Sequence, residues 1–522
     1  MDHAVIPAPV RFDGLSEGEF TFLPGTVVAY SDPRVAPLAE RFCAQFTRRT
    51  GTRVVAVRDA APASPFVMID LSPDADLDEI PAPAGLSPDG GDPADERYSL
   101  LIGTDQVIVR AAEPAGAARG LTTLTQLAAA GPAEVRLPAA RIGDGPRYAW
   151  RGLSLDVART FFTVEEIRRV IDLLELYKLN VLPLHLTDDQ AWRLPMGRPP
   201  GDAVSGDPCY STEDLRALVA YAADRFVTIV PEVDTPGHAT ALLRLHPELG
   251  TGRNEVDYEI LPGHPRHATW LDPELPATFG LMEQVLAGLA AVFPGPYLHI
   301  GADEPRGMPD DLYVAYVQRL RGLIRGLGRR PLGWQESARA GLEADDVIQF
   351  WLTGFDLAAD VPSQVRAQLD AELALARRDV EASAAASVPV IVSPLPYCYL
   401  DVPYAEPSAD AAQAGRHARL GLRIYGARTV AESFGWEPAG ALGAGRAEQV
   451  AGVEAAIWAE SITGFDDLCF LLLPPLAGVA HKAWSAPHLT TWPAHRDRLA
   501  RHGRLWAADG LTYFRSSAVN WA

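Results

Sequence analysis

Two adjacent acidic residues, Asp303 and Glu304, follow an apolar segment in the stretch YLHIGADE, residues 297–304. The apolar segment predicts a strand, and successive strand residues point to opposite faces, so we expect the two carboxyls to have different roles. Two carboxyl groups that flank one bond are the usual equipment of glycoside hydrolysis. A general acid must stay protonated, which a partly apolar, aromatic pocket allows. A solvated strand end, or a helix N-cap at Asp303, is the alternative interpretation.

Tryptophan residues end three other apolar segments, at Trp334, Trp351 and Trp458. A sugar ring has apolar C–H faces, and tryptophan offers a flat apolar area with few rotamers to restrict. Each of the three alone would be more typical of a protein core. Three at one rim favour a sugar-binding pocket.

Other segment ends carry residues that can form hydrogen bonds with sugar hydroxyls. Arg151 can donate paired hydrogen bonds through its fixed guanidinium fork, although a structural ion pair is the alternative. Asp401 and Glu460 can accept such bonds, and Tyr399 can donate one. These residues are therefore candidates for holding a sugar.

A histidine near the acids offers a second kind of chemistry. His238, in DTPGH, could form a carboxylate–histidine pair with Asp188, or it could be a core histidine with all its hydrogen bonds made. A metal-dependent hydrolase is the competing hypothesis, and it would use His185, Asp188, His238, His299 and Asp303. No two histidines stand at i, i+2 or i, i+4, so the sequence offers no ready ligand pair. We expect neither a metal nor another cofactor.

The elements that position these residues repeat a strand–loop–helix pattern from Tyr148 onward. Eight apolar segments are expected strands: 151–156, 180–186, 226–234, 297–304, 330–336, 346–352, 388–394 and 453–460. Amphipathic segments at 163–179 and 211–225 are expected helices, the first with a capping box between Thr163 and Glu166. Parallel strands need helical crossovers, so the fold class is α/β and eight units favour a (β/α)8 TIM barrel over a doubly wound sheet. Polar strand ends fit this fold, because barrel enzymes build their sites at the carboxyl ends of the strands.

The first part of the chain, residues 1–145, predicts a small non-catalytic α+β domain, and residues 146–522 the barrel with a helical C-terminal end. Expected strands are 25–30, 52–59, 65–71 and 106–111, and expected helices are 35–51 and 115–131. Residues 137–148 contain proline and glycine and are expected to form a joint between the domains.

The composition limits the partners of the chain. It has 522 residues, of which 48% are hydrophobic and 22% charged, and a formal net charge of −21. Such a charge argues against nucleic acid or an anionic membrane as a partner. Neither a leader nor an apolar run of about 20 residues is recognisable, so we expect a cytoplasmic protein, or a secreted one whose leader has been removed. The four cysteines match no zinc or redox spacing, and the oligomeric state is left open.

Several motifs together resemble glycoside hydrolase family 20, the β-N-acetylhexosaminidases. In order along the chain they are RGLSLDVAR, HLTDDQAWRL, PEVDTPGHA, HIGADE, GWQE, SPLPYCYLD and EAAIWAE. The resemblance spans the barrel, from about residue 148 to about 490, and the leading domain resembles the one that usually precedes it. It implies an exo-acting enzyme that removes terminal β-linked GlcNAc or GalNAc with retention of configuration.

The resemblance also implies a role for each candidate residue. In this family the 2-acetamido oxygen of the substrate attacks the anomeric carbon and gives an oxazolinium intermediate, an exception to the two-carboxylate scheme. Asp303 would then orient the acetamido N–H, and Glu304 would act as general acid and base. Tyr399 would hold the acetamido oxygen, while Asp188 and His238 would set the protonation of Glu304. The remaining candidates would surround the N-acetyl group or bind the outer hydroxyls: Trp334, Trp351, Trp458, Arg151, Asp401 and Glu460.

Departures from the family pattern leave some properties open. Ala302 stands where the family usually has glycine, and PRGMPDD after the acids is shorter than in many members. These differences bear on substrate range and on contacts with the leaving group. A catalytically weak carbohydrate-binding relative remains the third hypothesis.

Overall fold

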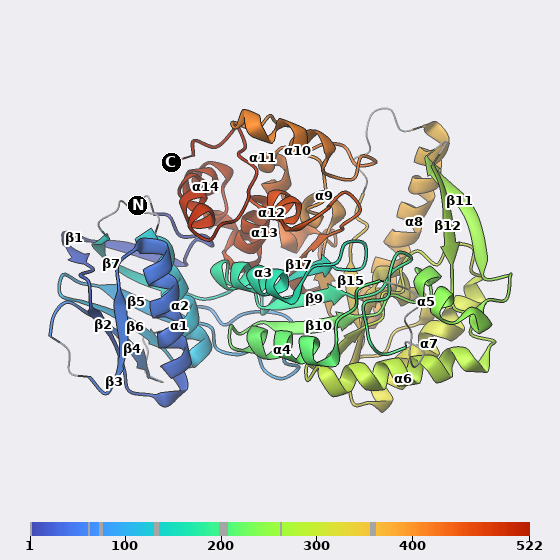
Figure 1. The fold of residues 1–522 in the computed structure, drawn as a ribbon, viewed down its shortest axis with the longest axis horizontal. Coiled ribbons are helices and arrows are strands. Elements are labelled where there is room, and N and C mark those ends of the chain that lie inside the picture. The colour runs from blue at the N-terminus through green and yellow to red at the C-terminus, as the bar shows by residue number, and fades with distance from the viewer. Residues whose placement is uncertain are drawn as a thin grey trace.

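The computed structural model of the chain describes residues 3–60, 63–72, 77–129, 135–197, 207–261, 264–354 and 362–521. A mixed sheet with two helices comes first and a closed barrel follows, with further helices on the outside of the barrel (Figure 1). Among the described residues, none of the helices combines the length and apolar composition needed to cross a membrane.

The first domain is built on a seven-stranded sheet with the order β1-β7-β5-β6-β4-β2-β3. Its strands are β1 (Arg11–Thr21), β2 (Thr26–Tyr30), β3 (Val54–Arg58), β4 (Phe66–Leu71), β5 (Tyr98–Ile102), β6 (Gln106–Ala111) and β7 (Arg136–Asp144). The four expected strands are found, whereas β1, β5 and β7 were not expected. The sheet is antiparallel around β5 and β7 and parallel from β6 to β3.

The predicted joint at 137–148 is wrong, because most of it is strand β7. Only Ala140–Asp144 pair with β5, so Pro138 lies beyond the end of β5 and faces β1 alone, close to an irregularity in the register. A proline at such a position does not interrupt hydrogen bonds on the other side of the strand.

Helices α1 (Ala36–Thr50) and α2 (Pro114–Ala129) pack against this sheet. Helix α1 ends at Gly51, whose left-handed φ of 74° suits glycine. Residues 130 and 131, the end of the second expected helix, lie outside the described part of the chain. Trp484 of a barrel-side helix is buried in the same apolar core, so the two domains share a packed boundary.

All eight expected barrel strands are present, and the (β/α)8 prediction is confirmed. The strands are β8 (Trp150–Asp156), β9 (Val181–His185), β10 (Thr228–Glu232), β13 (Tyr297–His299), β14 (Arg330–Trp334), β15 (Val347–Phe350), β16 (Val390–Val392) and β17 (Val450–Ile457). They are parallel and close into a barrel in the order β10-β13-β14-β15-β16-β17-β8-β9.

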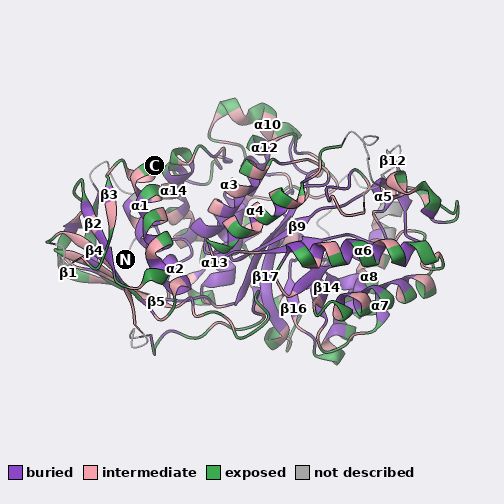
Figure 2. Cartoon of the chain, turned by 60° about the horizontal axis from the view of Figure 1, so that its bottom comes forward, coloured by how far each residue is buried: buried purple, intermediate pink, exposed green. Residues whose placement is uncertain are grey.

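The helices that alternate with the strands cover the barrel, and further helices follow its last strand. They are α3 (Val164–Leu176), α4 (Thr212–Ala223), α5 (Thr240–Leu245), α6 (Pro276–Val292), α7 (Asp310–Gly326), α8 (Ser363–Ala386), α9 (Leu395–Cys398), α10 (Ala414–Arg419), α11 (Val430–Phe434), α12 (Phe465–Leu472), α13 (Pro475–Trp484) and α14 (Trp492–Ala508). The expected capping box of α3 is present, and α4 begins with a second one at Ser211 and Asp214. Figure 2 shows buried strands beneath helices whose outer faces are exposed.

A hairpin of β11 (Glu255–Leu261) and β12 (His264–Thr269) stands apart from the barrel wall, on the same side of the molecule as α8 (Figure 1). Both elements contribute side chains to the cavity at the carboxyl ends of the barrel strands.

Candidate active site

A cavity of about 370 Å³ opens at the carboxyl ends of the barrel strands. Most of the predicted site residues line it: Asp188, His238, Asp303, Glu304, Trp351, Tyr399, Trp458 and Glu460. Strand ends far apart in the sequence converge here because the parallel strands all point the same way round the closed barrel.

The two acids lie in a turn after β13 rather than within the strand. Strand β13 ends at His299, and the backbone is left-handed at Gly301 (φ 66°), Ala302 (φ 74°) and Glu304 (φ 40°). The expectation that strand alternation separates the two carboxyls is therefore wrong. The turn separates them instead, because Asp303 lies beside His238 and Glu304 pairs with Arg306.

His238 connects Asp303 to Asp188. Its Nδ1 lies 3.3 Å from Asp188 Oδ1, and its Nε2 lies 3.8 Å from Asp303 Oδ2 and 3.8 Å from Asp234 Oδ2. Burial alone would lower the pKa of His238, but the carboxylates of Asp188, Asp234 and Asp303 raise it well above the ordinary value. The imidazole is therefore a cation that balances the acids of the site.

Asp234, which the sequence reasoning missed, lies behind Asp303. Its Oδ1 accepts a hydrogen bond from the Ala302 N–H at 3.1 Å, and the residue is buried. Burial raises the pKa of both Asp234 and Asp303; repulsion from Asp303 raises the pKa of Asp234 further, whereas a hydrogen bond with Asp234 lowers the pKa of Asp303. Asp234 thus holds a proton more readily, which leaves Asp303 as the ionised member of the pair. The missed signal was its position in PEVDTPGH, four residues before His238.

Glu304 lies against a cation. Its Oε1 accepts a hydrogen bond from Arg306 Nη2 at 2.7 Å. Burial would raise the pKa of Glu304, but Arg306 and then His238 lower it below the ordinary value. The expected apolar surroundings that would keep this acid protonated are not found in the free site, because the arginine lowers the pKa of Glu304.

Aromatic side chains form one wall of the cavity. The ring of Tyr399 is stacked with that of Trp351 at a centroid distance of 6.0 Å, and it meets the ring of Trp458 edge-on at 5.9 Å. Trp334 is 1% exposed and lies 5.9 Å from Trp458, and its Nε1 donates to Glu232 Oε1 at 2.8 Å. Trp334 therefore supports the wall from behind instead of lining the cavity.

Two further acids lie close together at the cavity: Glu460 lines it, whereas Asp401 is buried nearby and is not among the lining residues. Both carboxyl oxygens of Asp401 are buried without a hydrogen-bond partner among the described residues. Burial and the neighbouring Glu460 raise the pKa of Asp401 well above its ordinary value. Tyr425, which was not predicted, lines the cavity and is close enough to Asp401, Glu460 and Glu304 for their charges to raise the pKa of its phenol. Asp401 and Glu460 therefore offer oxygen atoms that could accept hydrogen bonds from the hydroxyl groups of a polyhydroxy ligand.

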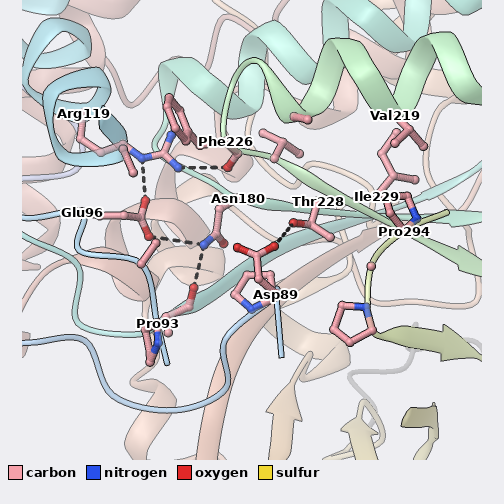
Figure 3. A pocket seen from close by; sticks show the side chains of 18 residues that line it. Asp89, Pro93, Glu96, Arg119, Asn180, Val219, Phe226, Thr228, Ile229 and Pro294 are labelled. Atoms are coloured by element: carbon pink, nitrogen blue, oxygen red, sulfur yellow. Dashed lines mark hydrogen bonds and ion pairs between the residues drawn. The ribbon is translucent and has the colours of Figure 1, made fainter. Parts of the chain in front are cut away.

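Arg151 does not belong to the cavity, and its assignment as a sugar-binding residue is wrong. It lies at the amino end of β8 and is fully buried, and its Nη2 donates to Glu96 Oε2 at 2.7 Å. Glu96 lines another cavity, of about 390 Å³, between the first domain and the amino ends of the barrel strands. Figure 3 shows Glu96 there, bound to Arg119 and to Asn180. Arg151 is thus part of a structural ion pair, the alternative noted above.

Arg159 takes the place at the cavity that was expected for Arg151. It follows the carboxyl end of β8, and its Nη2 lies 2.8 Å from Asp188 Oδ2. Its guanidinium lies over the Trp458 ring, 5.4 Å from the centroid. The signal was present in RGLSLDVAR, because only the second arginine of that motif comes after the strand.

The acids and histidines also form groups that could geometrically hold a metal ion. Asp234, His238 and Asp303 offer atoms within 4.8 Å of one another, as do His185, Asp188 and Asp234. Arg159 and a protonated His238 already supply the positive charge beside these carboxylates. His299, the remaining residue of the metal hypothesis, lies deeper, with its Nε2 3.1 Å from Gln349 Oε1. The donor set fits a charge-balanced acid–histidine network better than a metal-dependent hydrolase.

Comparisons with known proteins agree with this geometry. The model of the glycosyl hydrolase family 20 catalytic domain matches residues 148–308 and 307–487, and that of domain 2 of the same family matches residues 2–145. A β-N-acetylhexosaminidase from Cellulomonas fimi is 34% identical over 531 residues, which cover 100% of this chain and 97% of that protein.

Solved structures with the same architecture come from two Streptomyces species. The GH20 β-N-acetylhexosaminidase of Streptomyces coelicolor has a TM-score of 0.80 at 31% identity and covers 100% of this chain and 99% of its own. A mutant β-hexosaminidase of Streptomyces plicatus, in complex with GlcNAc, has a TM-score of 0.81 at 30% identity and covers 100% of this chain and 98% of its own.

Proposed function

Because the chain belongs to glycoside hydrolase family 20, the β-N-acetylhexosaminidases, we propose that it removes terminal β-linked GlcNAc or GalNAc by a retaining, substrate-assisted mechanism. The relative from Streptomyces plicatus binds GlcNAc, which supports a carbohydrate substrate here. The cavity at the carboxyl ends of the strands is the proposed site of the reaction.

One observation carries the proposal: Asp303 lines the same cavity as Trp351 and Tyr399 and has an oxygen that needs a donor. Its Oδ1 is buried and lacks a hydrogen-bond partner among the described residues. An acetamido group held against Trp351 and Tyr399 has one N–H to donate and an apolar methyl to bury. Asp303 would accept that N–H and stabilise the positive charge that develops on the nitrogen.

The first step follows from these positions. The acetamido oxygen of the substrate, held by the Tyr399 hydroxyl, attacks the anomeric carbon and forms the oxazolinium ion. Glu304 gives its proton to the glycosidic oxygen, which leaves with the electrons of the broken C–O bond. In the second step Glu304 takes a proton from a water molecule while the water oxygen attacks the anomeric carbon. The bond between that carbon and the acetamido oxygen breaks, so the oxazolinium ring opens and the acetamido group is restored with net retention.

The remaining polar residues bind the outer hydroxyls of the sugar. Asp401 and Glu460 accept hydrogen bonds from the non-reducing end of the sugar, and Arg159 donates to it in place of Arg151. Acceptors grouped in this way suit the outer hydroxyls of a terminal sugar, which supports exo action. The protonated His238, paired with Asp188, balances the negative charge of Asp303.

A panel of aryl β-glycosides with and without the 2-acetamido group tests the mechanism. We expect 4-nitrophenyl β-N-acetylglucosaminide to be hydrolysed and the matching β-glucoside to be nearly inert, because the glucoside lacks the attacking oxygen. The Asp303→Asn variant should lose about 10²–10³ in kcat, the effect of removing one transition-state contact. The Glu304→Gln variant should lose about 10²–10⁴ with poor leaving groups.

The exposed Glu283 on α6 supplies a control. Glu283→Gln also removes one carboxylate and should keep wild-type kinetics. Equal cleavage of the glucoside, or an unaffected Asp303→Asn variant, would contradict the substrate-assisted mechanism. Binding without turnover of any β-N-acetylhexosaminide would instead indicate the carbohydrate-binding relative, and loss of activity with a chelator would support the metal hypothesis.

A further inference from the structure

Arg306 lies between two carboxylates that come from different elements. Its Nη2 donates to Glu304 Oε1 at 2.7 Å, and its Nη1 donates to Glu372 Oε1 of α8 at 3.0 Å. The backbone N–H of Arg306 also donates to the carbonyl of Glu304 at 2.6 Å. The guanidinium fork therefore ties the acid in the turn after β13 to the helix beside the cavity.

The environment of Arg306 restricts its movement. Its side chain is 17% exposed, and its guanidinium lies 5.0 Å from the centre of the Tyr258 ring on β11. Glu304, with a left-handed φ of 40°, adopts a backbone conformation that non-glycine residues rarely take. A strained residue at a functional site is held by contacts around it, and Arg306 supplies two of them.

We propose that Arg306 is a positioning residue that holds the Glu304 carboxyl in place and sets the pH above which this acid can no longer donate its proton. The inference rests on the function proposed for Glu304, and it adds a control of the pH range in which this acid can act. Glu372 tunes the effect, because it competes with Glu304 for the same guanidinium.

The proton transfer shows what the pairing contributes. As the Glu304 proton moves to the glycosidic oxygen, the carboxyl becomes a carboxylate, and Arg306 is already in position to stabilise that charge. The pairing makes Glu304 a stronger acid, but it also leaves a smaller fraction of the free enzyme protonated as the pH rises.

Other charged or titratable groups also lie near Glu304, on several different elements. Apart from Arg306, they are His238 after β10, Arg159 after β8, Asp303 beside it, Tyr258 of β11 and Tyr425 of the loop after α10. Arg306 is the only one of these for which a hydrogen bond to the Glu304 side chain is recorded among the described residues. A change at Arg306 should therefore act directly on Glu304.

The sign of the pH effect follows from the direction of the shift. Arg306 lowers the pKa of Glu304, so the free enzyme loses the catalytic proton at a lower pH than an unpaired acid would. The alkaline limb of kcat/KM reports this group in the free enzyme. Removing the arginine should move that limb to higher pH.

The experiment compares pH profiles of kcat/KM on a β-linked N-acetylglucosamine disaccharide, whose leaving group needs a proton. Arg306→Gln should move the alkaline limb up by about one pH unit, since an adjacent opposite charge shifts a carboxyl by about 1–3 units. Arg306→Lys keeps the charge and should leave the limb near its wild-type position. Glu372→Gln should move the limb the other way, because Arg306 then pairs with Glu304 alone.

Arg319 supplies a matched control, since it is exposed on α7 and lies over the Phe279 ring with no recorded contact to Glu304. Arg319→Gln should leave the limb unmoved. A second measurement needs no turnover. In protein labelled with ¹³C at the glutamate carboxyl, the Glu304 signal is identified as the one that is absent from the Glu304→Gln variant. This signal should titrate at higher pH in the Arg306→Gln variant than in the wild type.

The two proposals fail in different ways. A wild-type protein that hydrolyses no β-N-acetylhexosaminide at any pH contradicts the proposed function. An active wild type whose alkaline limb and Glu304 signal do not move in Arg306→Gln overturns the inference about Arg306, and so does a shift in the same direction for Arg306→Gln and Glu372→Gln. Opposite shifts support it, because a merely structural role would lower activity without moving the limb.

Discussion

At the level of single residues, the cavity balances many acids with few cations. Arg159 and His238 both contact Asp188, while Arg306 forms ion pairs with Glu304 and Glu372. Burial would raise the pKa of Asp188, but Arg159 and His238 hold it well below its ordinary value. Each cation therefore keeps a particular carboxylate ionised, and removing one should change the chemistry of its partner.

Arg159 is the first residue to test. We expect Arg159→Gln to lower kcat/KM by about 10- to 100-fold, because a charged hydrogen bond contributes about 1.5–3 kcal/mol. Steady-state kinetics on 4-nitrophenyl β-N-acetylglucosaminide measure the effect, and most of it should appear in KM if Arg159 contacts the sugar hydroxyls. The control is Arg168→Gln on α3, whose arginine pairs with Glu165 at the surface. Kinetics of Arg159→Gln that match this control would remove Arg159 from the site.

At the level of elements, the turn after β13 carries Asp303 and Glu304, the proposed catalytic acids, in an unfavourable backbone conformation. A Cβ on Gly301 would overlap the Asp234 carboxylate, so glycine is required there. Ala302 has φ 74°, its N–H donates to Asp234, and its carbonyl accepts from the Tyr313 hydroxyl at 2.7 Å. The hydrogen bonds hold a residue that would otherwise avoid this conformation.

Replacing Ala302 with glycine should therefore stabilise the protein. An L-residue in the left-handed region costs roughly 1–2 kcal/mol, and the extra freedom of glycine in the unfolded chain offsets about 0.4–1 kcal/mol of the gain. We expect Ala302→Gly to raise the free energy of unfolding by about 1 kcal/mol, measured by urea denaturation. Ala500→Gly within α14, where the backbone is helical, should lower it by about 1 kcal/mol. A loss of stability in both variants would mean that Ala302 is not strained.

At the level of the whole molecule, buried ion pairs join the first domain to the amino ends of the barrel strands. Glu96 accepts hydrogen bonds from Arg119 of α2 and from Arg151 of β8. Close by, Asp144 at the end of β7 accepts from Lys178 Nζ at 2.9 Å and from Trp484 Nε1 at 2.9 Å. Because the domain boundary lies at the opposite end of the barrel from the proposed site, its groups should affect stability and not catalysis.

Glu96→Ala tests this separation. The substitution leaves two buried guanidinium groups without their carboxylate, and breaking a buried pair typically costs about 3–5 kcal/mol. We expect the thermal transition to move down by several degrees while kcat and KM stay at wild-type values at temperatures where the variant is folded. Glu113→Ala is the control, because its pair with Arg34 is exposed and such pairs contribute about 0–1 kcal/mol. Equal effects of the two substitutions would argue against a stabilising boundary.

Much of the architecture was predictable because the signals are local. Apolar segments at regular spacing identified all eight barrel strands, amphipathic segments and a capping box identified two of the barrel helices, and the acids and tryptophans followed from the strand ends. Strands β1, β5 and β7 were not predicted from the sequence, because they form by pairing with strands that are distant in the chain and because β7 contains a proline. A strand of that kind is stabilised by its neighbours more than by its own sequence.

The sequence alone thus identified the barrel and the family, and most of the site residues predicted from it line the cavity. Only the tertiary structure showed that the first arginine of RGLSLDVAR is held away from the cavity, because it pairs with Glu96, which is 55 residues away in the chain. Only the tertiary structure also paired Arg306 with Glu372, which is 66 residues away in the chain. Electrostatic partners are chosen by distance in space, and residue spacing carries little information about that distance once the chain has folded into a closed barrel.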